Sequence, residues 1–250
     1  MNQFQQLYRL RKLRSTKPFA ARGKGVNRCE YCQVAIENCI CSLKVESECQ
    51  AGVMLIMHDS EILKPSNTGR LIADVVPDCF PFLWSRTEPD QAMLAILEDP
   101  QWYPMIVFPM QYAQAEQKVI TERISPPNNR KPLFIILDGS WREARRMFRK
   151  SPYLAQLPLV TIATNQSALG TDSRYALRDS QVDNHLATAE VAAKLLSQQG
   201  EEKAGKLLDL WFDVFSWQYQ KSVCQKPIGS ESSISEYQSF VKQHSLTYKD

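Results

Sequence analysis

The stretch LFIILDGSWREARRMFRK, residues 133–150, decides how this chain folds. Its first five residues form an unbroken apolar run between Pro132 and Gly139. A short, β-rich apolar run without alternation is typical of a strand buried on both faces, as in a parallel sheet covered by helices. We therefore expect an α/β fold with a mainly parallel sheet flanked by helices. Asp138 would lie at the carboxyl end of its central strand.

The position of Asp138 has two interpretations. In open α/β sheets, ligands gather at the carboxyl ends of the strands, where loops and helix N-termini leave backbone N–H groups free. An acid at this place is suited to take part in chemistry. Asp, Gly and Ser are also good N-cap residues, so Asp138 could instead cap the helix that follows. The residues alone leave both roles open.

A helix with two different faces is predicted to begin at Trp141. At about 100° per residue, the apolar side chains fall on one side and the cationic ones on the other. A solvated basic face normally carries interspersed acids, and here only Glu143 is present. An anionic partner is therefore favoured over a merely solvated face. The cationic residues are Arg142, Arg145, Arg146, Arg149 and Lys150.

Apolar runs and helical periodicity elsewhere continue the α/β pattern. None of the polar loops has the glycine spacing of a P-loop or of a dinucleotide-binding strand-turn-helix, which disfavours nucleotide-triphosphate hydrolysis and Rossmann-type binding. Further strands are expected at residues 52–58, 80–84, 104–108 and 157–164, and helices from residue 70 and at 91–97, 186–199 and 201–221.

Length and composition bound the class of protein. The 250 residues, of which 44% are hydrophobic, can form one large domain, with or without a small appendage. Net charge is only +3, so partners must be inferred from where the charges lie. The chain has no apolar run of membrane-spanning length and no signal-peptide core, and its seven cysteines do not suit a secreted disulfide scaffold. We expect a cytoplasmic protein.

The first 28 residues carry eight basic side chains and no acid. Such a segment often contacts phosphates of a nucleic acid, although a solvated arm is an equally open interpretation. Cys29, Cys32, Cys39 and Cys41 follow within thirteen residues. This paired spacing favours a structural Zn²⁺ site over four reduced thiols. With four sulfur ligands the metal would have no open position for catalysis.

Two polar loops are candidates for binding an anion. Residues 64–69, Lys-Pro-Ser-Asn-Thr-Gly, lie between an expected strand and a helix and could bind phosphate or carboxylate through backbone N–H groups. Arg174 and Arg178, four residues apart, suit the same ligands but could equally pair with Asp172 or Asp179. His58 is interpreted as an ordinary polar residue at a strand end.

Six segments, in order, resemble the DTW-domain family, including its bacterial tRNA-uridine aminocarboxypropyltransferases. The resemblance covers nearly all of the chain up to about residue 220. The family's acid-x-Thr-Trp signature is present as Asp138-Gly139-Ser140-Trp141, with Ser in place of Thr. The segments are the cysteine cluster, KPSNTGR at 64–70, WSR at 84–86, LDGSWREARRM at 137–147, KSPYL at 150–154 and SRYALR at 173–178.

The resemblance implies an activity and a fold. The reaction would transfer the 3-amino-3-carboxypropyl group of S-adenosylmethionine to N3 of a uridine at position 47, in the variable loop of tRNA, and release 5′-methylthioadenosine. The fold would be SPOUT-like, with a knotted cofactor site. We expect a basic arm and zinc knuckle at 1–48, a DTW catalytic domain at 49–222 and a C-terminal tail at 223–250. tRNA is the expected partner, with no membrane and no obligate protein partner.

Roles for individual residues follow from that resemblance. Asp138 would remove the N3 proton or orient N3–H, Trp141 would pack against cofactor or uracil, and Ser140 supplies the hydroxyl of the signature. The alternatives are a SPOUT-like RNA methyltransferase and a zinc-stabilised RNA-binding protein without catalysis. The cofactor would be held by Leu137, Gly139 and Pro109 at its adenosine and by Ser66, Asn67, Thr68 and Gly69 with Arg86 or Arg174 at its carboxylate. The basic face of residues 142–150 would bind tRNA phosphates together with Arg22 and Arg28.

Overall fold

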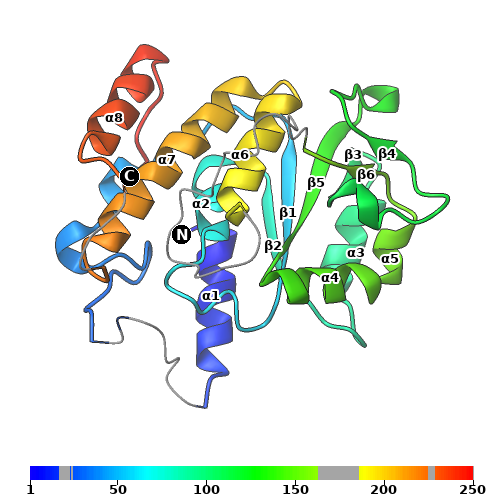
Figure 1. Ribbon diagram of the computed structural model, residues 1–250, viewed down its shortest axis with the longest axis horizontal. Coiled ribbons are helices and arrows are strands. Elements are labelled where there is room, and N and C mark those ends of the chain that lie inside the picture. Colours follow the sequence, from blue (N-terminus) through cyan, green and yellow to red (C-terminus); the bar gives the residue numbers. More distant parts are fainter. Residues whose placement is uncertain (17–22, 24, 163–185, 225–228, 250) are drawn as a thin grey trace.

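The structure, a computed structural model, describes the chain except residues 17–22, 24, 163–185, 225–228 and 250 (Figure 1). Its centre is a six-stranded sheet in the order β2-β1-β5-β3-β6-β4, and all neighbouring strands are parallel. The expected α/β fold with a parallel sheet is confirmed. The strands are β1 (Gly52–Met57), β2 (Cys79–Leu83), β3 (Trp102–Val107), β4 (Val119–Ile120), β5 (Lys131–Asp138) and β6 (Leu159–Val160).

Helices cover both faces of the sheet (Figure 1). α1, α2, α6, α7 and α8 pack on one face and α3, α4 and α5 on the other. The α-helices are α1 (Gln3–Leu13), α2 (Gly69–Val75), α3 (Gln91–Glu98), α4 (Trp141–Arg149), α5 (Pro152–Ala155), α6 (Thr188–Gln198), α7 (Glu202–Gln220) and α8 (Ser233–Gln243). Short 3₁₀ turns are η1 (Ile36–Asn38), η2 (Cys41–Leu43), η3 (Met110–Tyr112) and η4 (Pro127–Asn129).

β5 lies at the centre because both of its faces are apolar. Side chains alternate between faces along a strand, so Phe134 and Ile136 join the core under α2, α6 and α7, while Ile135 and Leu137 join the core under α4. Asp138 continues the series of Phe134 and Ile136. The period of two therefore directs its carboxylate toward α2 and α6 and away from α4.

Two features of the sheet differ from the sequence-based expectation. The strand expected at 157–164 is only the two-residue β6, followed by the described residues Thr161 and Ile162 without strand structure. A sixth strand, β4, also has only two residues, too few to produce an alternating pattern. Residues 163 and 164 lie outside the described part, as does the rest of 163–185, so the knotted cofactor site stays a prediction.

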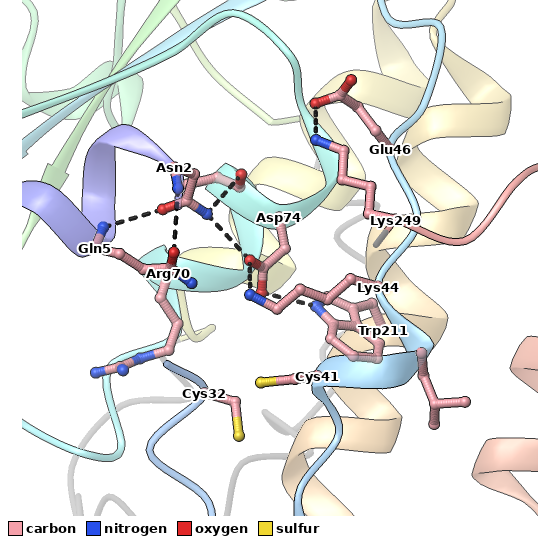
Figure 2. A network of polar contacts seen from close by, with 12 residues as sticks. Asn2, Gln5, Cys32, Cys41, Lys44, Glu46, Arg70, Asp74, Trp211 and Lys249 are labelled. Atoms are coloured by element: carbon pink, nitrogen blue, oxygen red, sulfur yellow. Dashed lines mark hydrogen bonds and ion pairs between the residues drawn. The ribbon is translucent and has the colours of Figure 1, made fainter. Parts of the chain in front are cut away.

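Within the basic N-terminal segment, the helix α1 packs on the rest of the protein. Asn2 and Gln5 form a reciprocal capping box, which satisfies backbone N–H groups at the start of the helix. Phe4 is buried in the core. Asn2 also donates to Asp74 Oδ1 (3.1 Å), and Lys44 Nζ reaches the same oxygen at 2.6 Å. Figure 2 shows how this network joins α1, α2 and the segment after Cys41.

The segments expected as an N-terminal knuckle and a C-terminal tail both pack on the sheet domain. Tyr237 of α8 is buried and donates from its hydroxyl to the carbonyl of Leu43 (2.9 Å). Asn38, next to the cysteines, donates to the hydroxyl of Ser222 at 3.0 Å. Among the residues that the structure describes, no helix is both long and apolar enough to cross a membrane.

Candidate active site at the carboxyl edge of the sheet

Asp138 ends β5 and is fully buried, at 0% exposure. Its Oδ2 accepts a hydrogen bond from Asn67 Nδ2 and its Oδ1 accepts one from the hydroxyl of Thr188, each at 2.6 Å. Charge-assisted hydrogen bonds of this length are strong, and they offset part of the cost of removing a carboxylate from water. Asp138 therefore joins three segments that are distant in sequence: β5, the 64–69 loop and the start of α6.

The 64–69 loop is held in place by the buried side chain of Arg70. Its Nε donates to the carbonyl of Asn67 (3.0 Å) and its terminal nitrogen to the carbonyl of Lys64 (2.9 Å). The guanidinium also lies 5.6 Å from the ring centre of Phe4 and 5.9 Å from that of Tyr8, within cation–π distance. Arg70 thus holds the loop in place through two of its carbonyl groups and connects it to α1.

The loop also approaches Asp138 too closely for a larger residue than glycine at position 69. A Cβ placed on Gly69 would lie 2.8 Å from Asp138 Oδ2. The hydroxyl of Thr68 accepts a hydrogen bond from the backbone N–H of Ala189 (3.3 Å). The structure therefore brings together four predicted site residues, Asn67, Thr68, Gly69 and Asp138. Ser66 lies beside them in the same loop and is half-buried.

Ser140, and not Asp138, is the N-cap of α4. Its hydroxyl accepts from the backbone N–H of Glu143 (3.4 Å), and Glu143 Oε2 accepts from the backbone N–H of Ser140 (2.7 Å). This reciprocal capping box excludes the alternative in which Asp138 only caps the helix. Ser140 is exposed, and its neighbour Gly139 is half-buried between Glu143 and His58.

His58, which follows β1, faces the same helix start. Its Nδ1 lies 3.2 Å from Glu143 Oε1 and 3.1 Å from the hydroxyl of Ser60, and its backbone N–H donates to the carbonyl of Asp138 (2.9 Å). Burial acts to raise the pKa of Glu143, but hydrogen bonds from the side chain and backbone of Ser140 outweigh it. The net effect is a lowered pKa. Glu143 is therefore held as a carboxylate at the start of α4, where the helix dipole favours negative charge.

Trp141 lies on the other side of this edge, in a group of aromatic rings. It stacks on Phe108 with ring centres 5.3 Å apart and planes 15° apart, and Phe108 stacks in turn on Phe148 at 4.4 Å and 3°. Tyr112 contacts both Phe108 and Trp141 edge-on. Leu137 and Pro109 border this group, because Leu137 points to the α4 face and Pro109 follows Phe108.

The basic face of α4 is exposed, as expected from the period of its side chains. Arg142, Arg145, Arg146, Arg149 and Lys150 are all exposed. Arg145 lies over the Trp141 ring at 5.7 Å and Arg146 over the Trp84 ring at 5.8 Å. Among the described residues, no ion pair joins these five cations to a carboxylate. The helix therefore presents positive charge that no carboxylate of the described residues pairs with.

Other predicted residues lie apart from this cluster or outside the described part. Arg86 is exposed beyond the end of β2, and the structure records no hydrogen bond from it to the described site residues. Arg28 donates to the carbonyl of Gln33 (2.9 Å) and stacks on Tyr219 (4.9 Å), so it holds the cysteine segment against α7. Arg22 and Arg174 lie outside the described residues.

Sequence reasoning missed two groups of site residues. The role of Thr188 could not be predicted from the sequence, because a threonine at the start of a predicted helix is usually interpreted as a capping residue. Its pairing with Asp138 spans 50 positions. Phe108 and Tyr112 were missed as partners of Trp141. Their signal was available, since Phe108 ends an expected strand directly before Pro109, at the same edge of the sheet as Asp138.

The four clustered cysteines have the geometry of a metal site. All four sulfurs lie within 4.8 Å of one another, with Cys29 and Cys41 3.7 Å apart and Cys32 and Cys39 3.8 Å apart. Four sulfurs around Zn²⁺ at about 2.3 Å in a tetrahedron are about 3.8 Å apart, so the donor set fits. The pKa of Cys32 is lowered to about 5, mainly by a hydrogen bond with the side chain of Cys41. The same hydrogen bond raises the pKa of Cys41. The cluster can therefore hold a metal ion.

One comparison with known proteins places the chain in a family. No solved structure matches the chain. The family model described as DTW domain matches residues 26–220, from just before the first cysteine to the end of α7. The matched range contains the cysteine cluster, the 64–69 loop and the Asp138-to-Trp141 signature. With most of its length matched in this way, the chain belongs to the DTW domain family.

Proposed function

We propose that this protein transfers the 3-amino-3-carboxypropyl group of S-adenosylmethionine to N3 of a uridine in the variable loop of tRNA, at position 47. Membership of the DTW domain family is consistent with a tRNA-modifying enzyme. The observation that carries the proposal is the junction at Asp138. There a buried acid joins the two family segments at 64–70 and 137–147 at the carboxyl edge of a parallel sheet.

The reaction requires a group that takes or orients the proton on N3, because a protonated uracil nitrogen is a poor nucleophile. A bond forms between N3 and the γ-carbon, the bond from that carbon to sulfur breaks, and 5′-methylthioadenosine leaves. S-Adenosylmethionine supplies the electrophilic carbon next to its positive sulfur. Asp138 is the proposed base or orienting group. A carboxylate has about four lone-pair sites, so each oxygen of Asp138 can accept from the substrate as well as from Asn67 or Thr188. Because Asp138 is fully buried, the residues that cover it must move before it can accept the N3 proton directly.

Local charge supports binding of the cationic donor on the Asp138 side of the edge. The buried carboxylate of Asp138 and the carboxylate of Glu143 lie around the ends of β1 and β5. A third acid there, Glu61, forms an ion pair with Lys64 and adds no net charge. The 66–69 loop is proposed to meet the amino-acid carboxylate with Arg86 or Arg174, and the backbone at Leu137, Gly139 and Pro109 to hold the adenosine. Trp141 is proposed to pack against the cofactor or the uracil.

Positive charge elsewhere supports RNA as the partner. The exposed face of α4 and the basic N-terminal segment, including Arg22 and Arg28, are proposed to contact phosphates, and the cysteine cluster is proposed to bind structural Zn²⁺. We expect the affinity for tRNA to fall steeply with salt, with a log–log slope of roughly −0.7 to −0.9 for each phosphate neutralised. Binding titrations from low to physiological salt measure this slope. Binding that does not depend on salt would contradict these contacts.

One incubation tests the reaction. The purified protein is mixed with tRNA and S-adenosylmethionine, the RNA is digested to nucleosides, and the products are identified by mass spectrometry. An aminocarboxypropyl adduct on uridine, with 5′-methylthioadenosine released, supports the proposal. A methyl adduct would identify the protein as a methyltransferase.

A zinc-stabilised RNA-binding protein without catalysis is the second candidate, and one observation favours it. Both oxygens of Asp138 already accept hydrogen bonds from the protein, which also suits a structural role. tRNA binding with no affinity for S-adenosylmethionine in calorimetry would select this candidate. Saturable binding of the cofactor would reject it.

A further inference from the structure

A small pocket lies beside the candidate active site, on the α4 side of the sheet edge. Its volume is about 230 Å³. Two of its residues, Phe108 and Tyr112, follow the carboxyl end of β3, and the others belong to α4. The lining residues are Phe108, Tyr112, Arg142, Arg145, Phe148 and Arg149.

The apolar part of this pocket is made of aromatic rings whose positions are fixed by stacking on one another. Phe108 is stacked between Phe148 and Trp141, at interplanar angles of 3° and 15°. Tyr112 meets Phe108 edge-on at 5.5 Å between ring centres and is half-buried. Phe108 and Phe148 are buried beneath it. A planar group that enters the pocket would therefore meet aromatic surface whose position is set before binding.

The polar part consists of three arginines on one face of α4. Arg142, Arg145 and Arg149 are spaced three and four residues apart, so they lie one above the other along the helix. All three are exposed, and none forms an ion pair with a carboxylate among the residues that the structure describes. Like charges at this spacing destabilise a helix slightly. An anionic ligand would remove that repulsion.

We propose that this pocket binds one unstacked nucleotide of the RNA, beside the uridine that is modified. The base lies against Tyr112, whose half-buried ring rests edge-on against Phe108, and the arginines hold the flanking phosphates. Single-stranded RNA is commonly bound in this way, by aromatic stacking combined with arginine contacts. That the neighbouring nucleotide is the modified uridine rests on the proposed function. The binding of RNA by the pocket does not.

Size and charge argue against S-adenosylmethionine as the occupant. Pockets that enclose a drug-sized ligand have volumes of roughly 300–1,000 Å³, and this pocket is smaller. Three guanidinium groups would also repel a sulfonium cation, whereas the carboxylates of Asp138 and Glu143 attract it. The sulfonium end of the cofactor thus suits the Asp138 side of the sheet edge, with the adenosine reaching Leu137, Gly139 and Pro109. The pocket at Tyr112 suits a nucleotide of the substrate.

Affinity for tRNA tests the pocket with matched variants. Tyr112→Ala should raise the dissociation constant about tenfold, because stacking on one base is lost, while Tyr112→Phe should keep wild-type affinity. Arg145→Glu should weaken binding and reduce the magnitude of the salt slope by about one. Lys242→Glu makes the same change in net charge on α8, which lies far from α4 (Figure 1), and should leave both quantities unchanged. Equal affinity for wild type, Tyr112→Ala and Arg145→Glu would overturn the proposal.

Photo-crosslinking locates the nucleotide. A tRNA carrying 5-iodouridine next to the target position should crosslink to the peptide that contains Tyr112, and the crosslink should be lost in Tyr112→Ala. Crosslinks confined to other peptides would overturn the assignment. The two proposals fail separately. A modified uridine with no effect of the pocket variants rejects only the pocket, and pocket-dependent binding with no modified nucleoside rejects only the transferase.

Discussion

At the scale of the residue, Asp138 combines a position that the sequence predicts with contacts that it does not. The apolar run before it fixes its place at a strand end, and the alternation of side chains fixes the face to which it points. Its partners come from far away in the chain, since Asn67 is 71 positions distant and Thr188 is 50 positions distant. Only the packing of α6 and the 64–69 loop on the sheet brings these donors to one carboxylate.

Asp138→Asn tests the proposed base. The asparagine can still accept from Asn67 and can donate to the hydroxyl of Thr188, which accepts as well as donates. The fold should therefore survive with a loss of about 1 kcal/mol in stability. Turnover should fall at least about 100-fold, because the basic group is gone. Single-turnover assays of tRNA modification, with melting temperatures measured in parallel, check both expectations.

Thr188→Val is the control variant, because it removes one hydrogen bond to Asp138 without changing Asp138 itself. It keeps the charge on Asp138 and should retain more activity than Asp138→Asn. Wild-type turnover in Asp138→Asn would rule out the carboxylate as base and leave it the role of orienting the 64–69 loop.

At the scale of the element, α4 carries Trp141 and the arginines of the basic face, and it depends on its first turn. The capping box of Ser140 and Glu143 satisfies backbone N–H groups that would otherwise lack partners. Trp141 and the arginines follow directly, so their positions depend on where the helix begins. The sequence predicted this helix and its two faces. It left open whether Asp138 or Ser140 was the cap, because both residue types cap helices well.

Ser140→Ala should lower the free energy of unfolding by about 1 kcal/mol, the usual contribution of an N-cap. Ser140→Thr keeps the hydroxyl and should have close to wild-type stability. Denaturant titrations of the three proteins measure these differences. An alanine variant as stable as wild type would show that the cap contributes nothing to α4.

Glu143 should make the stability of this helix start depend on pH. Its pKa in the folded protein is lowered, so its contribution is fully present above the unfolded value of about 4.3 and is lost as pH falls through the folded value. Glu143→Gln removes the titrating group and keeps an acceptor. The stability difference between wild type and this variant should be largest at neutral pH and should decrease in acid. Urea titrations at several pH values test this; a constant difference would contradict it.

At the scale of the whole molecule, the cysteine segment is connected to both ends of the chain. Lys44, three residues after Cys41, forms an ion pair with the buried Asp74, which also accepts from Asn2 and from Trp211 Nε1 (3.4 Å) (Figure 2). Burial of an ion pair is costly unless its remaining hydrogen bonds are made, and here Asp74 has several donors. Loss of order at the cysteines would therefore be transmitted to α1, α2 and α7.

Removal of the metal should destabilise the complete domain and not only the cysteine segment. We expect a chelator to lower the melting temperature of the purified protein in a single transition and Zn²⁺ to restore it. Cys39→Ser, which replaces an exposed ligand without leaving a cavity, should reproduce the effect. Cys224→Ser changes a cysteine outside the cluster and should not. A chelator-resistant protein without bound zinc would contradict the metal site.

The sequence by itself determined the class of fold, the central strand, the place of Asp138, the basic face of α4 and the cysteine cluster. These features are local, because a period of two or 3.6 residues and a short ligand spacing can be read from neighbouring positions. Only the tertiary structure decided the hydrogen bonds of Asp138 with Asn67 and Thr188, the aromatic stack on Trp141 and the docking of α1 and α8. Such contacts depend on which distant segments pack together, and no local period encodes that choice.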